Sequence, residues 1–248
     1  MERSIIIKEL EQYYNQEGII PLPGQFACKN LPKCSGDYAR GMQCHIGYEY
    51  GTRLRVLVAS LDCGNGGASS ISKRTDDVTE DAKGDKRDRH MKGTFEALAL
   101  FYDEKEPRNL VNYMAMTNTC KCCRLKGQKN SSNQMPVTCF RNCKDHTLAE
   151  ILLLAPQVIL FQGKNALVGC MDKLFPIEEV TDPDIKPYVM KFKYEGFECF
   201  AVPCIHPSAC YGRNAKRWKQ FYKGTEGNEA ILSKVADYIK NQLNTSLD

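Results

Sequence analysis

The chain has 248 residues, of which 42% are hydrophobic and 26% charged, so it can bury a substantial core without crosslinks. Its formal net charge of +4 permits a polyanionic partner but does not require one. It contains no run of about 20 apolar residues, the length of a membrane span, and no apolar signal segment follows its first residues. We therefore expect a cytoplasmic protein of one domain that does not bind membranes.

The 13 cysteines are the most unusual feature of the composition. Because their number is odd and no export signal precedes them, metal or cluster ligation plus buried thiols explains them better than a disulfide framework. Inert buried cysteines normally lie in apolar runs, as Cys199 and Cys204 do. Five others gather in one polar stretch instead: Cys120, Cys122, Cys123, Cys139 and Cys143.

The first third of the chain predicts a helix, a strand and a polar insertion. Apolar residues at helical spacing predict a helix over residues 5–14. Residues 53–61, rich in valine and leucine, predict a buried strand that ends in a glycine-rich turn at 62–67. Residues 69–89 are polar, dense in mixed charge and without apolar periodicity, so we expect a surface insertion there.

The rest of the chain alternates helices with strands. We expect helices over residues 92–101, 147–155, 163–174 and 228–243, and strands over residues 111–117, 157–161 and 197–205. Strands that alternate with helices predict a parallel sheet covered on both faces. The predicted fold is therefore a three-layer α/β/α sandwich with a central, mostly parallel, four-stranded sheet.

Ligands of such sheets collect at the carboxyl ends of the strands. The candidate segments are therefore those that follow predicted strands, at residues 62–67, 118–123 and 206–209. The glycine-rich turn lacks the Lys-Ser/Thr pair of a Walker motif and the third glycine of a dinucleotide fingerprint. We expect no nucleotide cofactor.

Three motifs, taken together, carry a resemblance to a known family. The first motif is NTCKC, which begins at Asn118. The second is Cys143 followed thirteen residues later by the proline of APQVILFQG, and the third is VPCIHPSA at residues 202–209. In order and spacing they resemble the N-x-x-K-C, P-x-V-I-x-x-x-G and P-T-x-H-P-S motifs of the iron-sulfur uracil-DNA glycosylases (family 4) of the uracil-DNA glycosylase superfamily, over roughly residues 28–214. We therefore expect residues 1–248 to form a single domain of this kind, with the insertion at 69–89.

The resemblance implies a metal centre. The positions that match the family's ligands for a 4Fe-4S cluster are Cys28, Cys34, Cys122 and Cys143. Three further cysteines crowd the same loop and offer substitutes: Cys120, Cys123 and Cys139. A tetrahedral zinc ion and a set of buried thiols without metal remain as alternatives.

The resemblance also implies two catalytic residues. His206 would hydrogen-bond the base carbonyl and stabilise the leaving base as negative charge develops on it. Asp62 would orient the attacking water from the turn after the first strand. Each has a structural alternative, because a histidine can cap a turn and an aspartate before glycine commonly forms one.

Substrate contacts are expected in three places. Asn118 offers an amide that can read a base edge, or it caps its loop. Ser208 stands beside the candidate histidine, and the basic segment that follows contains Tyr211 and Arg213, our candidates for the wedge that fills the gap of an extruded base. The alternative for that segment is a solvated helix with Trp218 packed beneath it.

Two departures from the family's pattern bear on the substrate. The G-E-x-P-G first motif is replaced by ASLDCG at residues 59–64, and the aromatic residue that stacks on uracil is not evident, with Met91 nearest before Gly93. Small and flexible residues around the base predict an enlarged pocket that accepts a modified pyrimidine, such as a bulky one in phage DNA.

The sequence therefore predicts a monomeric, monofunctional DNA glycosylase. It would hydrolyse the N-glycosidic bond of a flipped uracil or modified pyrimidine and leave an abasic site, in DNA repair or in defence against phage. One alternative is a non-catalytic nucleic-acid-binding protein with a cysteine-ligated metal platform. Another is an enzyme in which Cys63 or Cys204 is a nucleophile paired with His206.

Overall fold

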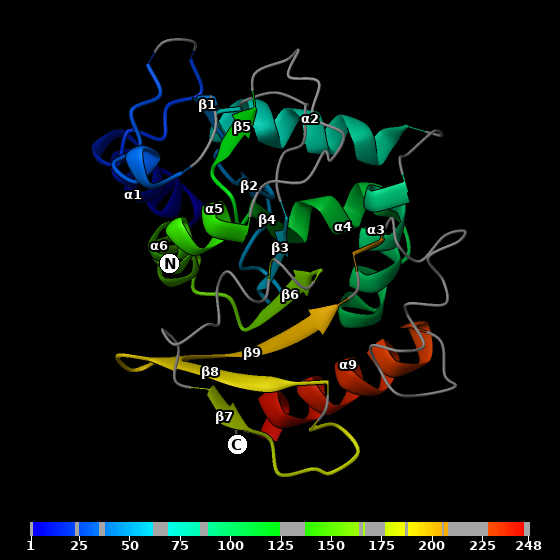
Figure 1. Cartoon of the computed structure of the whole chain (residues 1–248). Coiled ribbons are helices and arrows are strands. Elements are labelled where there is room, and N and C mark those ends of the chain that lie inside the picture. The colour runs from blue at the N-terminus through cyan, green and yellow to red at the C-terminus, as the bar shows by residue number, and fades with distance from the viewer. Residues whose placement is uncertain are drawn as a thin grey trace.

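The computed structural model of the protein describes residues 2–22, 25–34, 38–61, 69–84, 89–124, 137–163, 166, 177–186, 188–204, 206–207 and 228–245 (Figure 1). Its centre is a seven-stranded sheet. In spatial order the strands are β2 (His45–Ile46), β4 (Met114–Asn118), β3 (Val56–Ser60), β6 (Val158–Gln162), β9 (Phe197–Cys204), β8 (Met190–Tyr194) and β7 (Ile177–Glu179). The strands β4, β3, β6 and β9 run parallel, whereas β2, β8 and β7 pair antiparallel at the two edges.

The parallel strands are largely apolar because helices cover both faces of the sheet. Every residue of β3 and β6 is buried, and side chains alternate between the faces. Val56 and Val58 belong to one core cluster, whereas Leu57 and Ala59 belong to the other.

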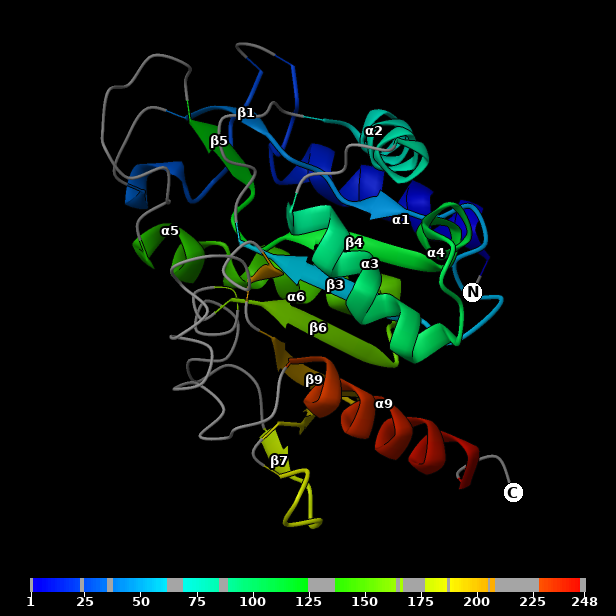
Figure 2. The same cartoon turned by 90° about the vertical axis from the view of Figure 1, so that its right-hand side faces the viewer.

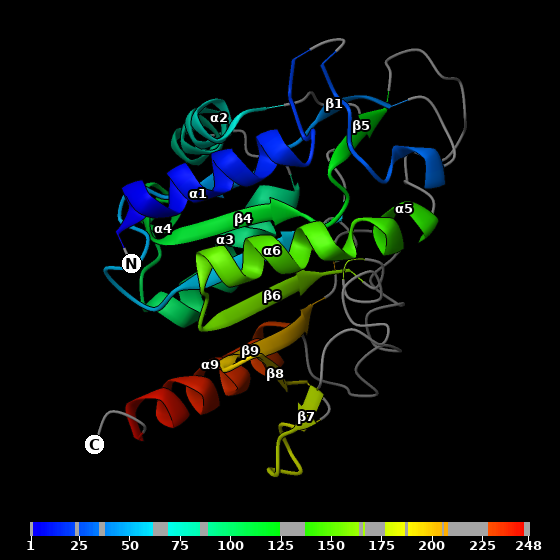
Figure 3. The same ribbon diagram turned by 90° about the vertical axis from the view of Figure 1, so that its left-hand side faces the viewer.

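In the described part of the chain, five helices line most of the two core clusters. The first core cluster is covered by α3 (Arg89–Tyr102), α4 (Pro107–Tyr113) and α9 (Asn228–Thr245), and the second by α1 (Arg3–Gln16) and α6 (Lys144–Leu154). Figures 2 and 3 show these two layers in front of the sheet from opposite sides. The predicted three-layer α/β/α fold with a mostly parallel sheet is confirmed.

The number of strands was predicted wrongly, since the sheet has seven strands and not four. The four parallel strands correspond to the four strands predicted from the sequence. The strand predicted over residues 111–117 is β4, which begins only at Met114, after α4 has ended. Of the three additional strands, β2 and β7 form the two edges of the sheet, and β8 lies between β7 and β9. In β8 the residues alternate between buried and exposed sides, and β2 has two residues, so neither produces an apolar run.

The segment predicted as an insertion contains a regular helix. Within residues 69–89, α2 (Ile71–Lys83) packs beside β2 and α4. Ser70 caps it by accepting a hydrogen bond from the backbone N–H of Lys73, at 3.3 Å. The buried face consists of Ile71, Thr75, Val78 and Ala82. Because two of these four are threonine and alanine, the helical periodicity is present but weakly apolar, which is why the sequence pattern did not reveal it.

A smaller two-stranded sheet lies beside the main one, formed by β1 (Tyr38–Gly41) and β5 (Cys122–Arg124). The short 3-10 helix η1 (Leu31–Lys33) and the helix α5 (Val137–Asn142) complete the described elements. The helix predicted over residues 163–174 falls outside the described residues except for Gly163 and Ala166. Among the described residues, no helix is both long enough and apolar enough to cross a membrane.

His45 makes the stability of the fold sensitive to acid. Its ring is fully buried, Nε2 donates to the carbonyl of Val111 at 3.1 Å, and burial lowers the pKa of His45 from 6.5 to about 3. The unfolded chain therefore binds a proton that the folded chain does not. The free energy of unfolding should fall as the pH drops from about 6.5 towards 3.

Replacement of His45 by Gln, which keeps a donor for Val111, should flatten this pH dependence. Urea midpoints measured at neutral and mildly acidic pH test the expectation. Equal pH slopes for the two proteins would show that the ring at position 45 is not responsible.

Candidate functional site

Residues at the ends of the four parallel strands meet at one edge of the sheet. Ser60 ends β3 and pairs in register with Asn118, the last residue of β4. Gln162 ends β6 and pairs with Cys204, the last residue of β9, two residues before His206. Two residues predicted from the sequence, Asn118 and His206, therefore flank this edge, with the ends of β3 and β6 between them.

His206 stacks on a second histidine that the sequence analysis missed. The ring of His90, in the first turn of α3, lies parallel to the ring of His206, with centroids 4.8 Å apart and planes inclined by 15°. Nε2 of His90 lies 2.8 Å from Oε1 of Gln162 and 3.2 Å from Oγ of Ser60. The imidazole of His90 is thus attached to the ends of β6 and β3.

Two glycines allow the chain to approach closely around His206. A Cβ on Gly93 of α3 would lie 2.7 Å from Cβ of Pro207, too close for any other residue without a shift. Gly163 has a φ of +102°, and a Cβ there would lie 3.4 Å from Cβ of His206. Glycine at both positions lets the His206–Pro207 segment pack between α3 and the end of β6.

Asn118 is buried, with 4% of its surface exposed, and its amide is oriented by a cation. Nη2 of Arg74, on α2, donates to Oδ1 of Asn118 at 3.5 Å. Burial lowers the pKa of Arg74, and the negative charges of Asp77 and Asp81 partly offset this by raising it. Since a guanidinium has no acceptor, the amide oxygen must face it and the amide nitrogen must face elsewhere.

Met91 does not face this edge. Only 5% of its surface is exposed, and it belongs to the core cluster between α3 and the sheet. Successive residues of a helix point about 100° apart, so His90 faces the strand ends while Met91 faces the core. The space beside Gly93 is likewise occupied by Pro207, so this glycine does not enlarge a pocket. The structure thus removes Met91 from the expected base pocket.

Four other predicted site residues lie outside the described residues: Asp62, Ser208, Tyr211 and Arg213. Cys63, the first candidate nucleophile, also lies outside them. Cys204, the second, is buried, and its thiol donates to the carbonyl of Val202 at 3.6 Å. That setting does not favour Cys204 as an exposed nucleophile.

The cysteines predicted as ligands come together beside the edge of the sheet. Cys120, Cys122, Cys139 and Cys143 form one buried cluster with Phe140, and Cys34 packs against it. Cys28 lies near enough to Cys122 and Cys143 for their charges to interact. Three of the four predicted ligands, Cys34, Cys122 and Cys143, thus meet in this cluster with Cys120 and Cys139. Sγ of Cys120 lies 3.7 Å from Sγ of Cys122.

The thiols of this cluster differ in acidity. Burial raises the pKa of Cys28 to about 11 and that of Cys34 to about 12. The pKa of Cys143 is lowered, chiefly because the Cys120 thiol donates to it, with help from the backbone N–H of Lys121 at 3.4 Å and from the Lys121 charge. Cys143 is therefore stabilised as a thiolate, the form that ligates metals.

The described thiols are of the type that ligates iron-sulfur clusters and zinc ions. Thiolates are the ligands of 4Fe-4S clusters, and four are required. These thiols lie in an apolar shell that includes Phe26, Leu31 and Leu61. In the described part of the chain, no three or more His, Cys, Asp or Glu side chains are arranged to hold one metal ion.

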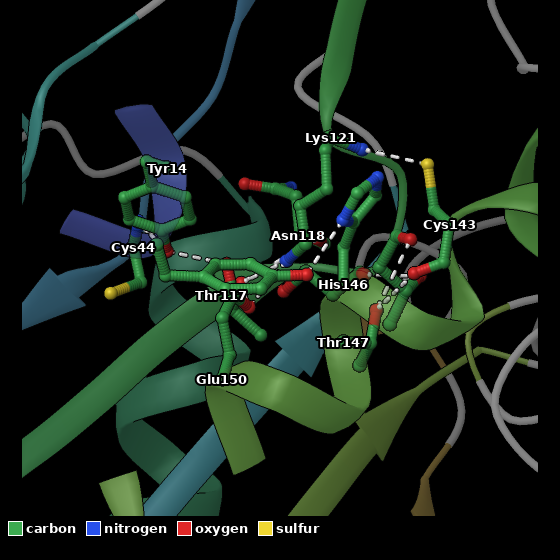
Figure 4. A network of polar contacts seen from close by, with 12 residues as sticks. Tyr14, Cys44, Thr117, Asn118, Lys121, Cys143, His146, Thr147 and Glu150 are labelled. Carbon is green, nitrogen blue, oxygen red and sulfur yellow. Dashed lines mark hydrogen bonds and ion pairs between the residues drawn. The ribbon is translucent and has the colours of Figure 1, made fainter. Parts of the chain in front are cut away.

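A buried ion pair connects the cysteine cluster to the end of β4 (Figure 4). Lys121 is 1% exposed and pairs with Glu150 of α6, which is fully buried. Nζ of Lys121 also donates to Oγ1 of Thr117 at 2.6 Å and to the carbonyl of Asn118. Glu150 accepts further hydrogen bonds from the hydroxyls of Tyr14 and Thr117. The loop between Asn118 and Cys122 is thereby fixed to α6 and α1.

No protein-family model matches the chain, and no curated protein matches it at a significant level.

Proposed function

We propose that the protein is a monofunctional DNA glycosylase that removes a flipped uracil or modified pyrimidine base from DNA. The observation that carries the proposal is the position of His206, which lies with Asn118 at the carboxyl edge of the parallel strands, beside the assembled cysteines. Ligand sites of open α/β sheets lie at this edge. Excision from oligonucleotides that carry a panel of bases tests the proposal.

The proposed reaction breaks the bond between the base nitrogen and C1′ of the sugar. The bonding electrons leave with the base, and a hydrogen bond from His206 to the base carbonyl stabilises the resulting anion. The oxygen of a water molecule bonds to C1′, and Asp62 is the carboxylate proposed to orient that water and accept its proton. The products are a free base and an abasic site.

We propose that Cys28, Cys34, Cys122 and Cys143 hold a 4Fe-4S cluster. Bound there, the cluster would crosslink the N-terminal segment to the loop after β4 and to α6. Since these thiols belong to three separate parts of the chain, we assign the cluster a structural role.

The purified protein should therefore be brown and contain about four irons per chain. Replacement of Cys143 by Ser should lower its iron content, solubility and thermal stability. Iron analysis and visible absorption provide the measurement, with Cys199→Ser as the matched control because Cys199 lies in the main core, away from the cluster. A colourless protein with stoichiometric zinc would contradict the assignment.

The substrate proposed is a substituted pyrimidine. Met91 lies in the core and Gly93 packs against Pro207, so neither residue supports a wide pocket. Two other features support it: the described first turn of α3 carries an imidazole and not a large aromatic side chain, and the turn after β3 is rich in glycine. We expect a 5-substituted pyrimidine to be excised faster than uracil under identical single-turnover conditions. If uracil is removed at least as fast as every substituted base tested, the substrate is plain uracil.

The second candidate function is binding of nucleic acid without catalysis, with the cysteine cluster as a platform. The observation in its favour is that the buried cysteine cluster does not include His206. Binding of DNA without excision of any base in the panel would support this candidate.

A further inference from the structure

Hydrogen bonds fix the orientation and tautomer of the His90 ring. The hydroxyl of Thr94 donates its proton to the carbonyl of His90 at 2.8 Å. The oxygen of the same hydroxyl must therefore accept the hydrogen bond from Nε2 of Gln162 at 2.9 Å. Oε1 of Gln162 must then face His90 and Ser60, and it can only accept. Oγ of Ser60 donates to it at 2.8 Å, and the proton on Nε2 of His90 does the same.

The imidazole of His90 therefore links three elements, its own helix and two strands. The ring projects from α3, and its partners Ser60 and Gln162 end β3 and β6. Both partners are buried, at 2% and 1% exposure, so water competes little for these bonds. A histidine held in this way cannot turn about its side-chain bonds without breaking buried hydrogen bonds.

We propose that His90 is a positioning residue for His206. The locked ring of His90 is the surface on which the imidazole of His206 stacks, 4.8 Å away and nearly parallel. His206 follows β9 directly, and the stack holds its ring in one plane before any base arrives. A donor that is already oriented stabilises a developing charge without the cost of reorganisation. The catalytic part of this inference rests on the proposed function, whereas the structural part does not.

The structural part is tested by NMR of the protein's 4 histidines. A ring proton that lies over the face of another aromatic ring is shifted upfield. Replacement of His90 by Ala should therefore move the His206 ring signals downfield. His90→Phe, which keeps a flat ring, should leave them near their original place, whereas His90→Gln, which keeps a polar group but no ring, should behave like His90→Ala. Unchanged His206 signals in folded His90→Ala and His90→Gln would overturn the proposal.

The catalytic part is tested by a double-mutant cycle in single-turnover excision. His90→Ala should slow excision about tenfold with little effect on DNA affinity, because the misplaced donor is missed chiefly in the transition state. In the His206→Ala background the same change should have no further effect. Lys92→Ala, on the exposed side of α3, is the matched control and should change neither the rate nor the NMR signals.

Two results separate failure of this inference from failure of the proposed function. If the effects of His90→Ala and His206→Ala multiply, His90 acts independently and the positioning role is wrong. If the wild-type protein excises no base, the proposed function fails, and the NMR comparison still decides whether His90 orients His206.

Discussion

Replacement of His206 by Ala is expected to lower the single-turnover rate of base excision by ~10²-fold or more. The hydrogen bond that we propose from this residue to the departing base would form as negative charge develops, so it would contribute to the transition state far more than to the bound substrate. DNA affinity should change little. Rates measured with enzyme in excess, together with binding isotherms on the same oligonucleotide, separate the two effects.

The matched control for this experiment is His45→Gln. His45 lies in the edge strand β2, and its buried ring is hydrogen-bonded to the carbonyl of Val111, whereas His206 follows β9, on the other side of β4. It should retain the wild-type excision rate at neutral pH. Weakened DNA binding with an unchanged rate in His206→Ala would contradict the catalytic assignment.

Removal of Lys121 is expected to have the largest effect on stability. Lys121→Met should lower the free energy of unfolding by about 3–5 kcal/mol, the usual cost of leaving one member of a buried ion pair without its partner. Glu150 would keep its hydroxyl donors, Tyr14 and Thr117, but would lose Lys121, the one cation that pairs with it among the described residues. Urea unfolding of the two proteins provides the measurement.

The double variant Lys121→Met with Glu150→Leu is the informative companion. It removes both charges and should recover much of the loss, because no buried charge then lacks a partner. If Lys121→Met costs less than about 1 kcal/mol, a surface-like value, the ion pair does not fix the loop between Asn118 and Cys122 as described.

The sequence was most informative where burial leaves a simple pattern. The parallel strands β3 and β6, and β9 from Cys199 onward, are buried on both faces, so they appear as largely apolar runs. The antiparallel strand β8 is partly exposed and carries lysines, which removes that signal. Helix α2 was missed because threonine and alanine supply half of its buried face.

The site shows the same division. Asn118, His206 and the cysteines could be proposed from the sequence because they belong to motifs of known order and spacing. His90, Gln162 and Arg74 were missed because their role depends on the phase of a helix or on the register of neighbouring strands. A one-residue difference in helical phase separates His90, at the strand ends, from Met91, in the core.

We expect the residues at the edge of the sheet that carries His206 to hydrolyse the N-glycosidic bond of a base in DNA. An excision assay tests this expectation most directly. Wild-type protein and His206→Ala are incubated with duplex and single-stranded oligonucleotides that each contain one uracil or one 5-substituted pyrimidine, and abasic sites are then cleaved with alkali. We predict cleavage at the modified position with the wild-type protein and almost none with His206→Ala at equal DNA occupancy. If the folded protein binds these oligonucleotides but produces no abasic site with any base, or if His206→Ala is as active as the wild type, the account is contradicted.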